Sequence, residues 1–208
     1  QSEEARAEAK ILMRVQEQIL SPRYGGPIIG GIQDYISAGY LLTRRGTYLT
    51  RKEVSSLVQA AAIKGELPQP ELKNPDRWSG KEIISMVLPK DINYTWKAKI
   101  CHKCDTCKKE DCQYDAYCVV KDGKLISGVF DKNAFGAGVP ESIFHSIVKN
   151  YGSDAARIFL DSITRLLLSY VTVKGFTMGI DDVELKEEAV NRIREILDQG
   201  QRKVDQLI

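Results

Sequence analysis

Apolar residues recur at helical spacing through the N-terminal part of the chain and predict a series of helices. Ser2 followed by two glutamates begins the first helix, because a hydroxyl cap and acidic first-turn residues satisfy free amides and the helix dipole. The apolar spacing continues to Leu20, and Ser21 with Pro22 ends this helix. A second helix is expected over residues 32–43.

Two capping boxes predict the helices that follow. In a capping box, a hydroxyl residue and a glutamate three positions later satisfy each other's backbone amides. Thr50 with Glu53 predicts a helix through residue 63, and Ser79 with Glu82 predicts one that ends at residue 88, before Pro89. Residues 65–75 contain three prolines and are expected to form a loop.

Beyond residue 92 the pattern changes to that of short strands. Strands are predicted over residues 94–100, 116–121 and 125–130. Asp122 and Gly123 lie between the second and third of these and are typical of a hairpin turn that needs positive φ. The first two strands flank a loop that is rich in cysteine.

The C-terminal third returns to helical spacing. Helices are expected over residues 143–149 and 154–172, and Ser153 caps the second of them. That second helix is apolar on nearly all sides, so we expect it to be buried. After a connector at 175–182, a long amphipathic helix with one narrow apolar seam runs from Leu185 to the last residues. We expect this seam to dock on another chain or on a missing part of a larger protein.

These elements predict an α+β fold. Helices surround a small antiparallel β-sheet with a cysteine-rich metal loop, and a long C-terminal helix follows. A chain of 208 residues has room for one large domain or two small ones.

Composition excludes several classes of protein. The chain is 43% hydrophobic and 28% charged, which is incompatible with a largely disordered or collagen-like chain. Thirty basic against 28 acidic residues leave a net charge of +2, whereas a free-standing nucleic-acid-binding protein usually has a larger basic excess. Uncharged runs are too short to span a membrane, so no membrane partner is expected.

The five cysteines all lie between Cys101 and Cys118. Two-residue spacings let thiolates converge on one ion, and four of them would close the site to substrate. We therefore expect a structural zinc in a reducing compartment, by default the cytoplasm. An iron–sulfur cluster and free or disulfide-bonded thiols remain alternatives. Cys118 is expected to be a buried hydrophobic residue. The expected zinc ligands are Cys101, Cys104, Cys107 and Cys112.

No catalytic residues are expected from the rest of the sequence. The glycine-rich stretch at 24–31 lacks the spacing of a phosphate-binding loop, although it allows the backbone to come close to another group. His145 is expected to be a packed or surface residue, and Asp181 with Asp182 a helix-capping pair. The basic cluster that contains Arg44 and Arg45 is either a solvated face or a contact for phosphate.

Three motifs occur in order and carry a family resemblance. They are GPIIGGIQD at 26–34, SGKEIISMVLP at 79–89 and GFTMGIDD at 175–182. Together they resemble the largest subunit of multi-subunit DNA-directed RNA polymerases, of the archaeal A′ type, along the whole chain. The resemblance implies a pore domain over residues 1–173, with the cysteine loop at 101–118, and the start of a truncated funnel domain at 174–208.

That resemblance also implies a function. In the family, pore and funnel form the secondary channel, where nucleoside triphosphates enter, the 3′ end of backtracked RNA leaves and transcript-cleavage factors dock. The expected partners are the other polymerase subunits, the rest of the same subunit and, in the assembled enzyme, the DNA template. Gln33 and Asp34 would approach the active centre, and Arg44 and Arg45 would contact nucleotide or RNA phosphates.

The resemblance further implies that the parent enzyme is a nucleotidyltransferase whose catalytic aspartates hold Mg²⁺. The family motif with these aspartates lies upstream of this segment, so the segment alone is expected to be inactive. The alternative function is a free-standing, zinc-stabilised nucleic-acid-binding module, which would bind RNA with a steep salt dependence. A small iron–sulfur redox protein is a third alternative, and visible colour would distinguish it.

Overall fold

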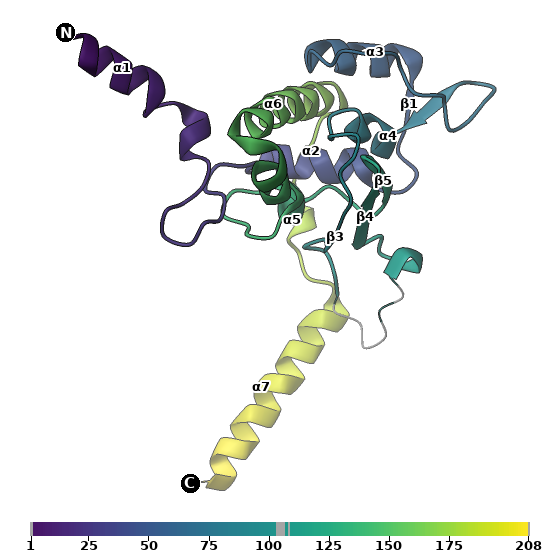
Figure 1. Ribbon diagram of the computed structural model, residues 1–208. Coiled ribbons are helices and arrows are strands. Elements are labelled where there is room, and N and C mark those ends of the chain that lie inside the picture. The colour runs from purple at the N-terminus through teal and green to yellow at the C-terminus, as the bar shows by residue number, and fades with distance from the viewer. Residues whose placement is uncertain (1, 103–106, 108, 208) are drawn as a thin grey trace. The chain divides into compact units, whose positions relative to one another are not determined.

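The computed structural model describes residues 2–102, 107 and 109–207, and it divides the chain into two compact units. Unit 1 comprises residues 1–174 and unit 2 comprises residues 175–208 (Figure 1). Among the described residues, unit 1 contains helices α1 to α6, the short 3-10 helices η1 and η2, and strands β1 to β5, whereas unit 2 contains the 3-10 helix η3 and helix α7.

The first predicted helix is shorter than its apolar spacing indicated. Ser2 caps helix α1 (Glu3–Ile11) as expected, with its hydroxyl accepting from the amide of Ala5 at 3.3 Å. The chain then leaves the helix and forms η1 (Val15–Gln18). No residue of α1 is buried, so tertiary packing does not stabilise a longer helix here.

The two capping boxes are confirmed. The Thr50 box begins α3 (Arg51–Ala60), and the Ser79 box begins α4 (Gly80–Ser85). Both helices end a few residues before their predicted ends. Helix α2 (Asp34–Thr43) contacts both α4 and α6 (Ile143–Lys174) (Figure 1).

The described strands form two small antiparallel sheets instead of one. In the first, β1 (Tyr48–Thr50) pairs with β2 (Arg77–Ser79), which the sequence pattern did not reveal. In the second, β3 (Tyr94–Lys97), β4 (Tyr117–Lys121) and β5 (Lys124–Ser127) lie in that order. Mixed helix and antiparallel sheet is thus confirmed as the fold class.

The predicted hairpin is also confirmed. Asp122 and Gly123 have φ angles of 47° and 70° and join β4 to β5. Between β3 and β4, the short 3-10 helix η2 (Lys109–Asp111) belongs to the cysteine loop.

Helix α6 contains both of the C-terminal helices predicted for unit 1. The helix is interrupted at Gly152, whose φ is 86° and ψ 173°. The expectation that residues 154–172 are buried on nearly all sides is wrong in part, because Ile158 and Leu168 are 56% and 49% exposed. The inner face of α6 packs against α2, α3 and α5 (Lys132–Phe135).

The glycine-rich stretch approaches the chain's own backbone. The amide of Gly31 donates to the carbonyl of Phe135 at 2.8 Å, and the amide of Ala137 donates back to the carbonyl of Gly31 at 3.1 Å. These two bonds form an isolated parallel bridge between segments far apart in the sequence. The glycines therefore serve packing within unit 1.

Glycines at the contacts of helix α2 let the backbones of neighbouring segments come close together. A Cβ atom at Gly39 would clash with the carbonyl oxygen of Phe130, and one at Gly80 would clash with the carbonyl oxygen of Leu42. Glycine at these positions lets α2 lie directly against α4 and against the segment before α5. The hydroxyl of buried Thr43 links α2 to the segment before α5. It donates to the carbonyl of Gly39 and accepts from the amide of Phe130, each at 2.7 Å.

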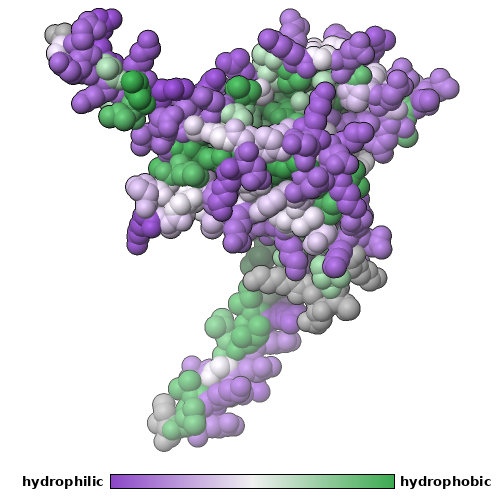
Figure 2. Space-filling view, in the orientation of Figure 1, coloured by the Kyte–Doolittle hydropathy of each residue, from purple (hydrophilic) through white to green (hydrophobic). Residues whose placement is uncertain are grey.

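Unit 2 consists of a connector with the short 3-10 helix η3 (Ile180–Asp182), followed by a long helix. The carboxylate of Asp182 accepts from the amide of Gly179 at 2.8 Å, which is the capping role expected of it. Helix α7 (Glu187–Leu207) is the predicted amphipathic helix, with its apolar side chains gathered along one side (Figure 2). No helix among the described residues is long and apolar enough to cross a membrane.

We predict that Thr43→Val lowers the free energy of unfolding of unit 1 by about 1–3 kcal/mol, because it leaves the buried amide of Phe130 without an acceptor. Thr172→Val is the matched control, since its exposed hydroxyl makes the same bond to the residue four positions earlier but no tertiary bond. The control should change stability by less than about 0.5 kcal/mol. Tryptophan fluorescence during urea unfolding measures both, because Trp78 and Trp96 belong to unit 1. Equal effects of the two variants would contradict the prediction.

The burial of His145 leads us to predict that the stability of unit 1 depends on pH. It is buried, its Nδ1 accepts from the amide of Glu141 at 3.2 Å, and its Nε2 has no partner within the described part of the chain. Burial, with the nearby charge of Lys149, lowers the pKa of His145 below its usual value of 6.5. The unfolded chain therefore binds the proton first, and stability is lost as pH falls below about 6.5 towards the folded pKa.

The measurement is the free energy of unfolding at pH 7.5 and pH 5.5. His145→Gln removes this titration, so the variant should lose less stability than the wild type over that interval. An identical loss in both proteins would show that His145 does not cause it.

Candidate functional site: a cationic cleft beside the cysteine loop

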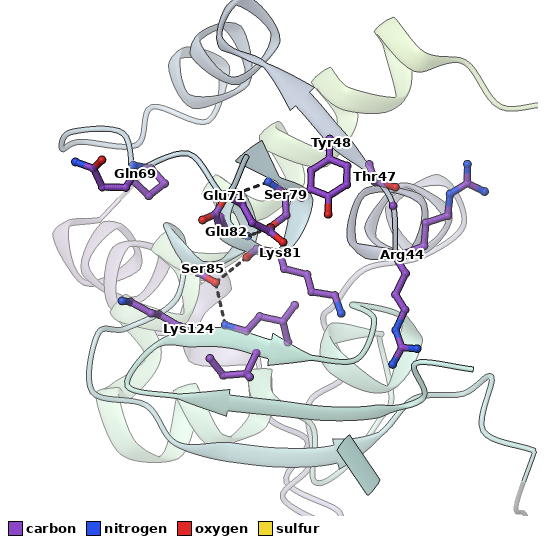
Figure 3. A pocket seen from close by; sticks show the side chains of 16 residues that line it. Arg44, Thr47, Tyr48, Gln69, Glu71, Ser79, Lys81, Glu82, Ser85 and Lys124 are labelled. Atoms are coloured by element: carbon purple, nitrogen blue, oxygen red, sulfur yellow. Dashed lines mark hydrogen bonds between the residues drawn. The ribbon is translucent and has the colours of Figure 1, made fainter. Parts of the chain in front are cut away.

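One cleft of unit 1 has a volume of about 860 Å³ and is open to solvent. It lies between the segment that joins α2 to β1, the proline-rich loop, the start of α4 and strand β5 (Figure 3). Its basic residues outnumber its acidic ones. The basic residues are Arg44, Arg45, Lys81 and Lys124, and the acidic residues are Glu71 and Glu82.

One acid of this cleft is tied to the backbone. The carboxylate of Glu82 accepts from the amide of Ser79 at 3.0 Å in the capping box. Burial raises the pKa of Glu82 above its ordinary value. Glu82 is therefore engaged in capping α4, and its carboxyl group is harder to ionise than that of a free glutamate.

The end of helix α2 places the two arginines. Arg44 is the C-cap of α2, where its φ and ψ of −60° and 150° turn the chain out of the helix. Gly46 follows with a φ of 79°, and the chain enters β1. Cations at this end of a helix are favoured by the helix dipole. Figure 3 shows Arg44 beside Thr47 and Tyr48 on one side of the cleft, across from the strand that carries Lys124.

A buried carboxylate connects the cleft to the cysteine loop. Asp115 accepts from Lys81 Nζ at 2.7 Å through Oδ2 and from the amide of Gly128 at 2.9 Å through Oδ1. The Nε of Arg45 lies 3.6 Å from the same Oδ1. Arg45 also donates through Nη2 to the carbonyl of Cys112 at 2.9 Å. Two cleft cations thus share one counter-ion, and one of them contacts the cysteine loop directly.

A second cleft, of about 800 Å³, lies on the other side of the same segment, towards α3 and α6. Its basic residues are Arg44, Lys52 and Lys174, and its one acid is Glu53. Hydrogen bonds from the side chain and the backbone of Thr50 lower the pKa of Glu53. Arg44 lines both this cleft and the first one.

The structure separates the four residues expected to face the active centre or nucleotide. Gln33 and Asp34 are exposed at the N-terminal end of α2, and Gln33 has a φ of 45°. Arg44 and Arg45 follow the other end of this ten-residue helix, roughly 15 Å away at 1.5 Å per residue. Only the two arginines line the cleft.

The predicted metal ligands lie only partly within the described residues. Cys104 lies outside them, whereas Cys101, Cys107 and Cys112 are described and are free thiols. Among the residues that the structure describes, no group of three or more His, Cys, Asp or Glu side chains could hold a metal ion. The zinc site therefore stays a prediction.

Cys118 behaves as predicted. It is fully buried, and its thiol donates to the carbonyl of Val129 at 3.2 Å. Burial raises the pKa of this thiol to about 12, so it stays protonated near neutral pH.

Sequence reasoning missed Lys81, Lys124 and Asp115. Lys81 lies within the capping-box motif, and Lys124 follows the hairpin turn, so both look like ordinary solvated residues in the sequence. Asp115 is 34 positions from Lys81, and no local pattern could reveal that they pair. In the sequence, only the adjacent arginines 44 and 45 indicated this cleft.

Comparison with known proteins identifies relatives along the whole chain. The family described as RNA polymerase Rpb1, domain 3, matches residues 18–183. DNA-directed RNA polymerase subunit Rpo1N of Methanocaldococcus jannaschii is 52% identical over 100% of this chain and 15% of its own length. Rpo1N of Methanothermobacter thermautotrophicus strain Delta H is 50% identical, over 100% of this chain and 23% of its own length.

A human relative matches as well. DNA-directed RNA polymerase III subunit RPC1 is 33% identical over 100% of this chain and 16% of its own length. The chain thus spans less than a quarter of each of these three relatives. With a family match over most of the chain and these identities, the chain belongs to the Rpb1 domain 3 family of largest RNA polymerase subunits.

Proposed function

We propose that this chain forms part of the wall of the secondary channel of a DNA-directed RNA polymerase. Residues 1–173 would be the pore domain and residues 174–208 the start of the funnel domain. The family match over residues 18–183 and relatives named as RNA polymerase subunits support this proposal. The division into compact units at residue 174 is compatible with such a boundary.

The observation that carries the proposal is the cationic cleft after helix α2. Arg44 and Lys124 make no ion pair with any residue that the structure describes, so their charges are available to an anionic ligand. Guanidinium groups bind phosphate oxygens in a bidentate manner, and oriented donors stabilise the charge. Arg44 and Arg45 would contact the phosphates of an entering nucleoside triphosphate or of the extruded RNA 3′ end.

The other end of α2 would have a different task. Gln33 and Asp34 would face the active centre, with the length of the helix separating them from the phosphate contacts. In the parent enzyme, a nucleotidyltransferase, the chemistry would be performed by Mg²⁺ and aspartates elsewhere. This segment would contribute shape and charge, and alone it would not polymerise nucleotides.

The partners follow from that placement. They would be the other polymerase subunits, the rest of the same subunit, nucleoside triphosphates, the RNA 3′ end, the DNA template and a transcript-cleavage factor. The enzyme would act in the cytoplasm. A free-standing nucleic-acid-binding module is the alternative, and the same cleft would then bind RNA without any assembly.

Cys101, Cys104, Cys107 and Cys112 would hold a structural zinc ion. Four thiolates within twelve residues are a donor set that zinc prefers, and the ion would stabilise the loop between β3 and β4. Cys118 would not take part, because its thiol is buried and bonded to the carbonyl of Val129.

We predict that Arg44→Ala combined with Arg45→Ala raises the KM for nucleoside triphosphates of the assembled polymerase about two- to fivefold per lost contact, with little effect on kcat. The measurement is steady-state elongation by polymerase that contains the complete subunit. Arg23→Ala is the control, because Arg23 is exposed and lines neither of the two clefts.

An unchanged KM, together with unchanged cleavage of backtracked RNA, would contradict the proposed contacts. The alternative function has its own readout. If the 208-residue chain alone binds short RNA tightly and with a steep salt dependence, the free-standing module is favoured.

We predict about one zinc ion per chain by elemental analysis after purification without chelators. Cys112→Ser should lower both zinc content and thermal stability, because a structural zinc site contributes directly to folding. Cys118→Ala is the matched control and should keep its zinc. Metal-free wild-type protein, or equal zinc loss in the two variants, would refute the site.

A further inference from the structure

The side chain of Asp115 is placed where it can orient the cations of the cleft. It is 7% exposed, and both of its oxygens are engaged. Asp115 itself has a φ of 52°, and the amide of this residue donates to the carbonyl of Cys112 at 3.0 Å in a tight turn. The turn brings the Cys112 carbonyl and the Asp115 carboxylate to the same guanidinium.

Arg45 is fixed along one edge only. Of the five donors of a guanidinium, the Nη2 donor to Cys112 is used, and Nε faces Asp115. The donors of Nη1 and the second donor of Nη2 remain for another ligand. The side chain is 54% exposed and lines the cleft, so the free edge is accessible to a phosphate.

Lys81 is held in a different way. It is 17% exposed and its Nζ lies 2.7 Å from Asp115 Oδ2, so its charge is largely paired. Lys81 therefore anchors the carboxylate from the α4 side, whereas Arg45 remains the member of this group that can bind an anion. Fixing a side chain before binding removes part of the conformational entropy that binding would otherwise cost.

We propose that Asp115 is a positioning residue, which with the Cys112 carbonyl presets the guanidinium of Arg45 for a phosphate group in the cleft. This inference rests on the proposed function of the cleft and adds a means by which the cysteine loop sets its affinity. The two descriptions of Asp115 make opposite predictions. As a simple negative charge it would repel phosphate, whereas as a positioning residue it strengthens phosphate binding.

The test is a titration of the 208-residue chain with inorganic pyrophosphate, followed by calorimetry. Asp115→Asn removes the charge but keeps an acceptor for the Gly128 amide, and asparagine tolerates a positive φ. Although the variant is more positive, we expect its affinity for pyrophosphate to be about five- to tenfold weaker. In an Arg45→Gln background, Asp115→Asn should no longer weaken binding, because no guanidinium is left for it to position.

Arg45→Lys tests the same point on an exposed side chain, where folding is not at risk. Lysine keeps the charge but cannot contact both Asp115 and the Cys112 carbonyl with a planar fork, so we expect a similar weakening. Arg23→Lys, at an exposed arginine outside the cleft, is the matched control and should bind as the wild type does.

A spectroscopic readout separates positioning from general destabilisation. The side-chain Nε–H signal of Arg45 in ¹⁵N NMR spectra, assigned by its loss in Arg45→Lys, should shift and sharpen towards that of a mobile arginine in Asp115→Asn. The signal of Arg23 should stay unchanged.

The outcomes distinguish this proposal from the one on which it rests. Equal or tighter pyrophosphate binding by Asp115→Asn, or full binding by Arg45→Lys, would overturn the positioning role and leave the phosphate cleft intact. Wild-type protein that does not bind pyrophosphate would overturn both.

Discussion

The arrangement of unit 1 depends on the close approach of the backbone of helix α2 to the backbones of its neighbours. Gly39 and Gly80 leave no room for a Cβ atom, because carbonyl oxygens of neighbouring segments occupy that space. The buried hydroxyl of Thr43 then bonds to the amide of Phe130 and fixes the end of the helix. Protein interiors are packed as closely as crystals, so this arrangement leaves little freedom in where α2 ends.

The position of that end determines the cleft. The chain leaves α2 at Arg44, so both arginines lie at the junction of α4, β5 and the cysteine loop. Asp115 reaches the same junction from a turn within the cysteine loop and pairs with Lys81. A buried carboxylate is unfavourable unless it is paired and hydrogen-bonded, and here the described partners satisfy both oxygens. The apolar packing thus sets the distances, and the buried charge pair sets the orientation of the side chains on the cleft wall.

The sequence was informative wherever the signal is local. Capping boxes at Thr50 and Ser79 and the turn at Asp122 depend on neighbouring residues, and all three form as expected. Sequence patterns whose structure depends on contacts with distant segments were less reliable. The apolar spacing up to Leu20 predicted one helix, but α1 ends at Ile11 because its apolar side chains have no buried surface to pack on. The strands β1 and β2 are three residues each, too short for an alternating pattern to show.

By itself the sequence determined the class of fold, most helix starts, the hairpin, the buried role of Cys118 and, through three ordered motifs, the family. These features follow from residues that are close in the chain or from motifs that need no geometry. Tertiary structure alone decided that Arg45 and Lys81 share Asp115 and that glycines 30 and 31 pack on residues 135–137. Such contacts join positions tens of residues apart, and their existence depends on the close packing of the whole unit, which no local pattern encodes.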